Sequence, residues 1–227
     1  MRLAEPPRLR RKERRTLTME EVTTKLLPVL QGHRLRAAFL ALFMLGLRRG
    51  EVLGLRWQDI DLKAGLVHIR QALVRITHHE ARRTELVFQE PKTASSRRTI
   101  PLPEICLVAL RSHRAQQAEE RLRLGHGYTD HDLVFCQADG GPMNPRTMNR
   151  YFTQVINQAG LPAIRLHDAR HTYATWLLEH GVSPKVAQTL LGHSSITITL
   201  DLYSHVSLEM EKQAAATINA ALTRGLQ

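Results

Sequence analysis

The chain has 227 residues, of which 43% are hydrophobic, so it can build a core in one large domain or two small ones. Lysine and arginine number 32 against 21 acidic residues, and the formal net charge of +11 favours a polyanionic partner, with nucleic acid first. Two isolated cysteines and no apolar run near the roughly 20 residues of a membrane span argue against a disulfide scaffold or a membrane protein. We expect a cytoplasmic protein with reduced, buried thiols at Cys106 and Cys136.

The N-terminal residues 1–16 are polar, basic and proline-containing, and lack the apolar stretch of a signal peptide. We interpret them as a flexible basic arm or the remnant of a linker, followed by one domain over residues 17–227. That domain opens with a strong helix signal. Thr18 can cap a helix and Glu21, three residues later, completes a capping box. We predict that this helix ends near Leu30.

Proline and glycine mark the predicted starts and ends of the later helices. Ser183 is a good N-cap and Pro184 suits a first helical position, while Gly46, Gly181 and Gly192 follow apolar segments as stops. Helices are predicted over residues 36–45, 49–55, 103–124, 144–158, 166–179, 184–191, 196–202 and 207–222.

Strand signals gather between these helices. Val, Ile, Leu and Thr partly alternate over residues 66–76 and 84–90, and a short third strand is predicted over 97–100, whereas 57–61 is predicted as a turn. The predicted fold class is therefore α+β, mainly α, with a small three-stranded antiparallel sheet.

Candidate chemical groups concentrate in the last third. His167 and Arg170 are three residues apart on a predicted helix and share a face with His171. Taken singly, a buried histidine and an ion-paired arginine are the simpler interpretations. The i,i+4 histidines also match a zinc-helix spacing, but Asp168 replaces the glutamate of HExxH and no cysteine is near, so we expect no metal.

Five further residues complete the candidate set. Arg48 stands at a helix start, where free N–H groups suit a phosphate, and Glu51 can orient a basic side chain. Lys92 lies in the turn of the predicted hairpin, and His193 follows Gly192. Tyr203 follows the short helix; tyrosine needs a base or strong positive potential to act as a nucleophile, because its pKa is about 10.

Together these segments resemble the tyrosine recombinase (phage integrase) family over about residues 17–210. The order and spacing of five segments carry the resemblance, and any one alone is weak. They are Gly46-Leu47-Arg48-Arg49-Gly50-Glu51, Lys92-Thr93 with Arg98-Thr99-Ile100-Pro101-Leu102, Leu166-His167-Asp168-Ala169-Arg170-His171-Thr172, Leu191-Gly192-His193-Ser194-Ser195, and Asp201-Leu202-Tyr203-Ser204-His205.

The resemblance implies a role for each residue. Arg48 and Arg170 would hold the scissile phosphate through planar forks of N–H donors. Lys92 would protonate the leaving 5′ oxygen, His167 would assist proton transfer at the nucleophile Tyr203, and His193 would donate to a phosphate oxygen. Glu51 would support the site structurally.

The implied activity is cleavage and rejoining of double-stranded DNA through a 3′-phosphotyrosyl intermediate, without ATP, metal or other cofactor.

Relatives carry N-terminal DNA-binding domains that close around the duplex, and residues 1–16 are too short for one, so we expect an isolated or truncated catalytic domain. Residues 208–222 could dock on a neighbouring subunit of a tetramer or fold back on their own domain. A non-catalytic DNA-binding fragment that regulates a full-length recombinase and a type IB-like topoisomerase are the alternatives.

Overall fold

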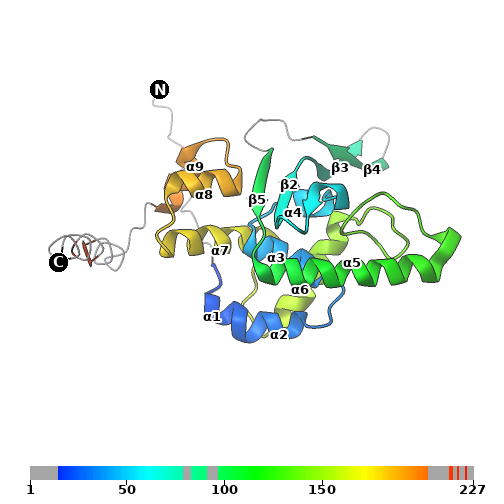
Figure 1. The fold of residues 1–227 in the computed structure, drawn as a ribbon, viewed down its shortest axis with the longest axis horizontal. Coiled ribbons are helices and arrows are strands. Elements are labelled where there is room, and N and C mark those ends of the chain that lie inside the picture. Colours follow the sequence, from blue (N-terminus) through cyan, green and yellow to red (C-terminus); the bar gives the residue numbers. More distant parts are fainter. Residues whose placement is uncertain are drawn as a thin grey trace, which may run out of the picture.

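The computed structural model describes residues 15–78, 83–90 and 97–203, together with positions 215, 216, 219 and 223. Within these ranges the chain is mainly helical, with short antiparallel strands between two groups of helices (Figure 1). The predicted fold class is therefore confirmed. Lys92, most of the predicted N-terminal arm and nearly all of the predicted helix over residues 207–222 lie outside the described residues.

The first helical segment begins as the capping signal predicts. The Thr18 hydroxyl accepts a hydrogen bond from the Glu21 amide at 3.0 Å, and the Glu21 carboxylate accepts one from the Thr18 amide at 3.0 Å. The segment then runs without a break through three stretches of different winding. They are α1 (Met19–Glu21), the π-helical η1 (Val22–Leu26) and α2 (Leu27–Leu30).

A single apolar helix lies at the centre of the core. Seven of the nine residues of α3 (Arg36–Met44) are buried, because it is apolar on nearly every side. It packs against two other helices, α5 (Glu104–Leu124) and α7 (Leu166–Glu179). Phe152, from α6 (Pro145–Gln158), stacks on Phe43 with 6.1 Å between ring centroids. Short 3₁₀ turns flank this core, at η2 (Trp57–Asp59) and η4 (Gly125–Gly127).

The strands form two separate units, which corrects the prediction of one sheet. The three-stranded antiparallel sheet has the order β1-β2-β5, with Val67 opposite both Ile60 and Ile100. The other two strands pair as a hairpin, with Val74 opposite Val87. The strands are β1 (Ile60–Asp61), β2 (Leu66–Ile69), β3 (Ala72–His78), β4 (Arg83–Gln89) and β5 (Arg98–Pro101). β1 lies in the segment predicted as a turn.

The single strand predicted over residues 66–76 is interrupted because β3 turns onto helix α4 (Arg49–Leu53). The side-chain amide of Gln71, between β2 and β3, donates to the Gly54 carbonyl at 2.8 Å. A Cβ at Gly50 would lie 2.9 Å from the Leu73 carbonyl oxygen, and one at Gly54 2.9 Å from the Ala72 Cα. Two glycines four residues apart therefore let the hairpin backbone approach α4 closely.

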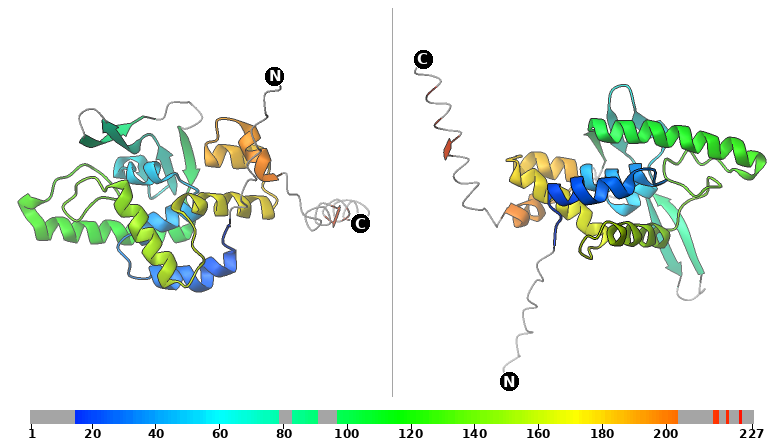
Figure 2. Two further views of the ribbon diagram at one scale, coloured as in Figure 1. Left: turned by 180° about the vertical axis from the view of Figure 1, so that it is seen from behind. Right: turned by 90° about the horizontal axis from the view of Figure 1, so that it is seen from below.

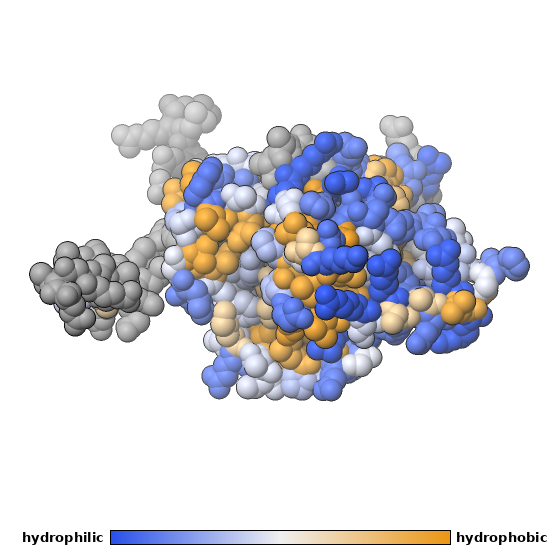
Figure 3. Space-filling model, in the orientation of Figure 1, coloured by the Kyte–Doolittle hydropathy of each residue, from blue (hydrophilic) through white to orange (hydrophobic). Residues whose placement is uncertain are grey.

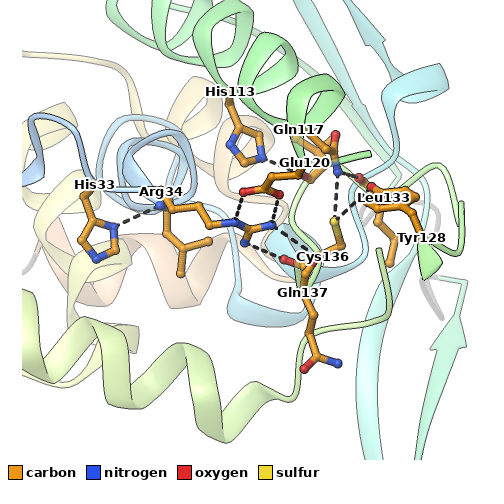
Figure 4. Close-up of polar contacts among 11 residues, drawn as sticks. His33, Arg34, His113, Gln117, Glu120, Tyr128, Leu133, Cys136 and Gln137 are labelled. Atoms are coloured by element: carbon orange, nitrogen blue, oxygen red, sulfur yellow. Dashed lines mark hydrogen bonds and ion pairs between the residues drawn. The ribbon is translucent and has the colours of Figure 1, made fainter. Parts of the chain in front are cut away.

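A half-buried ion pair holds the far end of α5 in place. Arg34 donates through Nε and Nη2 to the two carboxylate oxygens of Glu120, at 2.7 Å each, and through Nη1 to the Cys136 carbonyl at 2.8 Å (Figure 4). Gln117, one turn before Glu120, donates to the Cys136 sulfur at 2.9 Å. These contacts tie α5 to the connection that precedes α6.

The surface reflects the basic composition. Hydrophilic side chains cover much of the face over α5 (Figure 3), and the β3–β4 hairpin extends from the helical body (Figure 2). Within the described ranges, every helix is too short or too polar to cross a lipid bilayer.

Truncating the core at Phe152 tests this packing. Phe152 is 1% exposed, so Phe152→Ala leaves a cavity and should lower the free energy of unfolding by about 3–5 kcal/mol in urea denaturation. Leu122→Ala is the control, because Leu122 is 84% exposed and its loss should change the value by no more than about 0.5 kcal/mol. Equal effects of the two changes would contradict the packing described.

Candidate active site

Arg48 is the residue immediately before α4, held there by Glu51 one turn later. The Arg48 backbone is extended (φ −70°, ψ 149°), and its amide donates to Glu51 Oε2 at 2.8 Å. Its guanidinium Nη1 donates to Glu51 Oε1 at 2.9 Å. The Arg48 side chain remains 39% exposed. The helix start therefore holds the guanidinium in place while the side chain stays partly exposed to solvent.

The same carboxylate binds a second arginine from β5. Arg98 donates through Nη1 to Glu51 Oε1 at 3.0 Å and through Nη2 to Oε2 at 2.9 Å. Both side chains are buried, at 3% exposure for Arg98 and 6% for Glu51. Burial opposes the ionised carboxylate, but the hydrogen bonds and charges of Arg98 and Arg48 lower the Glu51 pKa to about 2.

Three arginines meet at the C-terminal end of α8 (Pro184–Leu191). The last carbonyls of a helix lack partners within the helix and form the negative end of its dipole, so they attract cations. Here three consecutive carbonyl oxygens each accept from a different arginine. The bonds are Arg98 Nε to Leu190 at 2.8 Å, Arg170 Nη2 to Leu191 at 2.5 Å, and Arg48 Nη2 to Gly192 at 2.9 Å.

Gly192 makes this convergence sterically feasible. It ends α8 in the left-handed conformation, with φ +63°, which glycine adopts without strain. A Cβ at this position would stand 2.8 Å from Arg98 Nη1. The glycine that the sequence marks as a helix stop therefore also makes room for the buried guanidinium.

Arg170 lies on α7 and is 4% exposed. Besides the α8 end, it donates through Nη1 to the Gly46 carbonyl at 2.7 Å, which ties α7 to the turn before α4. Burial, with the nearby charges of Arg48 and Arg98, lowers the Arg170 pKa to about 9, against the opposing effect of Glu51. The guanidinium therefore stays charged at neutral pH.

His193 follows the helix end and is 9% exposed. Its Nδ1 lies 2.9 Å from the Thr199 hydroxyl, on α9 (Ile196–Tyr203). Burial and the charges of Arg170 and Arg48 lower its pKa to about 4, so the imidazole is neutral at neutral pH. His193 borders a groove of about 270 Å³ whose other lining residues include Lys185 and Arg98.

The structure brings some predicted site residues together and leaves others untested. Arg48, Glu51, Arg170 and His193 converge around the end of α8, which also contacts β5 and α7 (Figure 1). Lys92 lies outside the described residues. The Tyr203 backbone forms the last residue of α9, and its side chain is not among those described.

His167 and His171 pair on the exposed side of α7. Their rings stand edge to face with 4.9 Å between centroids, and the charge of His171 contributes to lowering the His193 pKa. The described part of the chain contains no group of three or more histidine, cysteine, aspartate or glutamate side chains that could hold a metal ion.

Arg98 is the site residue that the sequence interpretation missed. The sequence did contain a signal for Arg98. Residues two apart on a strand face the same side, so Arg98 shares a face with Ile100, and both are buried. An arginine on the inward face of a strand requires a buried acceptor, and Glu51 is the supporting acid already identified.

The arrangement has a defined chemical capacity. At neutral pH the guanidiniums of Arg48, Arg98 and Arg170 and the carboxylate of Glu51 carry two positive charges in excess, and His193 adds none. A guanidinium can donate two parallel hydrogen bonds to phosphate oxygens, and the Arg48 side chain is 39% exposed. The cluster can therefore bind a phosphate and stabilise additional negative charge on it.

The sequence is similar to those of known integrases and recombinases. The sequence profile of the phage integrase family matches residues 8–210. A tyrosine recombinase XerC-like protein of Caldanaerobacter subterraneus subsp. tengcongensis is 37% identical over 210 residues, which cover 90% of this chain and 54% of that protein. An integrase of Saccharopolyspora erythraea is 27% identical over 263 residues, covering 96% of this chain and 60% of the relative. The chain thus spans little more than half the length of these relatives.

Solved structures show the same fold. The Tn1549 transposon integrase in complex with transposon right end DNA superposes with a TM-score of 0.76 at 24% identity, covering 92% of this chain and 67% of that one. The XerA recombinase gives a TM-score of 0.67 at 23% identity, covering 93% and 66%.

The low pKa of His193 predicts a pH dependence of stability. Between pH 6.5 and about 4 the unfolded chain binds a proton at this residue and the folded chain does not, so the free energy of unfolding should fall as pH falls through that window. In this window the wild type should lose on the order of 2 kcal/mol of unfolding free energy through His193, and His193→Gln should not show that loss.

The measurement is urea denaturation at several pH values, in wild type and variant. Other histidines titrate in both proteins, so only the difference between the two profiles reports His193. Parallel profiles would show that His193 is not protected from protonation in the folded chain.

Proposed function

This chain belongs to the phage integrase family, and we propose on that basis that it is the catalytic domain of a site-specific DNA recombinase. It acts on double-stranded DNA, cleaving and rejoining strands through a 3′-phosphotyrosyl intermediate. The observation that carries the proposal is the convergence of Arg48 and Arg170, 122 positions apart in sequence, on consecutive carbonyls at one helix end.

In the proposed cleavage step, the phenolic oxygen of Tyr203 attacks the scissile phosphorus in line. A Tyr203–phosphorus bond forms and the bond to the 5′ oxygen breaks. The phenolic proton passes to solvent with the assistance of His167, and Lys92 donates a proton to the departing 5′ oxygen. A 5′ hydroxyl of another strand then reverses the step. Each phosphodiester bond is exchanged for another, so ATP is not consumed.

Charge matching supports this chemistry. A phosphodiester carries one negative charge in the ground state, and a second charge develops as a pentavalent transition state forms. The two excess positive charges of the cluster match that higher charge better than the ground state, which is the condition for catalysis. These cations are side chains, so the proposed step calls for no metal ion.

A neutral His193 fits a donor role. When the Thr199 hydroxyl donates to Nδ1, the imidazole proton lies on Nε2, which can donate to a non-bridging phosphate oxygen. The pKa of about 4 means that this donation needs no protonated imidazole at neutral pH. His193 thus stabilises the transition state without adding charge.

Covalent capture on DNA tests the proposal. The full chain is incubated with a library of nicked duplexes of random sequence, in which cleavage releases a short oligonucleotide and traps the protein on the DNA. The wild type should form an adduct that survives denaturation, Tyr203→Phe should form none, and Arg170→Lys should slow its formation on the order of 100-fold.

The remaining outcomes separate the alternatives. Sequence-selective binding with no adduct on any duplex would overturn the proposal in favour of a non-catalytic DNA-binding fragment. Relaxation of a supercoiled plasmid that carries the captured sequence, with no strand exchange, would favour a topoisomerase.

A further inference from the structure

Arg98 occupies an unusual place for an arginine so close to the candidate site. It borders two surface grooves, one of about 450 Å³ and one of about 270 Å³, yet only 3% of its side chain is exposed. Arg48, bound to the same carboxylate, is 39% exposed. Arg48 therefore faces solvent, whereas Arg98 lies in the interior.

The hydrogen bonds of Glu51 link these two arginines directly. Each carboxylate oxygen accepts one bond from each of them. Oε1 accepts from Arg98 Nη1 at 3.0 Å and Arg48 Nη1 at 2.9 Å, and Oε2 accepts from Arg98 Nη2 at 2.9 Å and the Arg48 amide at 2.8 Å. The carboxylate cannot rotate without breaking bonds to both. The direction of the Arg48 guanidinium is thus set by Glu51, and that of Glu51 by Arg98.

Arg98 also fixes the end of α8. Its Nε donates to the Leu190 carbonyl at 2.8 Å, one residue before the carbonyl that binds Arg170 and two before the one that binds Arg48. His193 continues the chain directly after this turn. One buried guanidinium thus connects β5, α4 and the segment that carries His193.

A contribution to stability does not by itself explain why the Arg98–Glu51 ion pair is buried. Burying two charges carries a desolvation penalty that often offsets their attraction, and well-packed apolar side chains of similar volume can be as stable. The planar fork of arginine instead fixes direction, which lysine and apolar side chains cannot do. The geometry therefore suits orientation more than net stabilisation.

We propose that Arg98 is a positioning residue for the proposed strand cleavage: through Glu51 and the Leu190 carbonyl it holds Arg48 and His193 in the geometry that binds the transition state. The inference rests on the proposed function. Arg98 itself touches no substrate, so its loss should lower the rate of the chemical step far more than the affinity for DNA.

The test compares Arg98→Met and Arg98→Lys with the wild type on the captured duplex. Single-turnover adduct formation at saturating DNA should slow on the order of 100-fold in both variants, whereas the Kd for intact DNA should change by less than about threefold. Arg98→Lys keeps the charge and most of the packing, so it serves if Arg98→Met fails to fold.

A matched control separates positioning from stability. Arg34 also binds a carboxylate through two nitrogens and donates to backbone carbonyls, but it does so at the far end of α5 (Figure 4). Arg34→Met should also lower the midpoint of thermal unfolding, and it should leave the cleavage rate within about threefold of wild type. If Arg98→Met and Arg34→Met slow cleavage equally at equal folded fraction, the inference is wrong.

The pH profile gives a readout that a purely structural role would not move. Without Arg98 the largest pKa-lowering partner of Glu51 is gone, so its pKa should rise and the variant should lose activity in acid at a higher pH than the wild type. Adding Glu51→Gln to Arg98→Met should abolish that acid limb without restoring the rate. An unchanged acid limb in Arg98→Met would overturn the inference.

The two hypotheses fail in different ways. If the wild type forms no adduct on any duplex, the proposed function fails and the role of Arg98 falls with it. If the wild type forms adducts and the Arg98 variants match its rate, only the positioning role is excluded.

Discussion

The arrangement of the site depends on one buried carboxylate that accepts four hydrogen bonds from two arginines. Glu51 lies in the first turn of α4, Arg48 caps that turn, and Arg98 reaches it from β5. A carboxylate in this position would be costly to bury alone, and Arg98 would be costly to bury without it. The three groups therefore stabilise one another in their ionised forms, and they place one exposed guanidinium beside one buried guanidinium.

At the end of α8, Arg170 joins Arg48 and Arg98 to form a larger cluster. The last carbonyls of α8 lack helical partners, and three arginines from three different parts of the chain satisfy them. The helix dipole favours positive charge at this end, which partly offsets the repulsion among the guanidiniums. Positive charge is thereby held in place before any anion arrives. Such preorganisation is what electrostatic stabilisation of a phosphate transition state requires.

The sequence predicted most of the helices because their ends carry local signals. The Thr18–Glu21 capping box, the Ser183-Pro184 start and the Gly192 stop are each read within a few residues, and each lies where predicted. The strand break at residues 70–71 was not predictable in the same way. It follows from the contact of β3 with Gly50 and Gly54, which only the tertiary structure reveals.

The site shows the same division between local and long-range signals. Arg48, Glu51, Arg170 and His193 lie close together in the structure, whereas the roles of the predicted site residues stay predictions, as do the positions of Lys92 and of the Tyr203 side chain. Arg98 was missed although it lay in a predicted strand, because a strand signal alone does not show which acidic group an inward-facing arginine binds. Its partner lies 47 residues earlier in the sequence. Pairing at that separation is decided by packing and leaves little trace in the local pattern.

The most direct measurement of the central claim is the ionisation of Glu51 itself. The side-chain carboxyl carbons of ¹³C-glutamate-labelled protein are followed by NMR as the pH is lowered, with Glu51→Gln identifying the resonance. If two arginines hold this carboxylate, its signal should stay at the ionised position at pH 4, in keeping with a pKa of about 2. A midpoint near the ordinary glutamate value of roughly 4.3 would contradict the account.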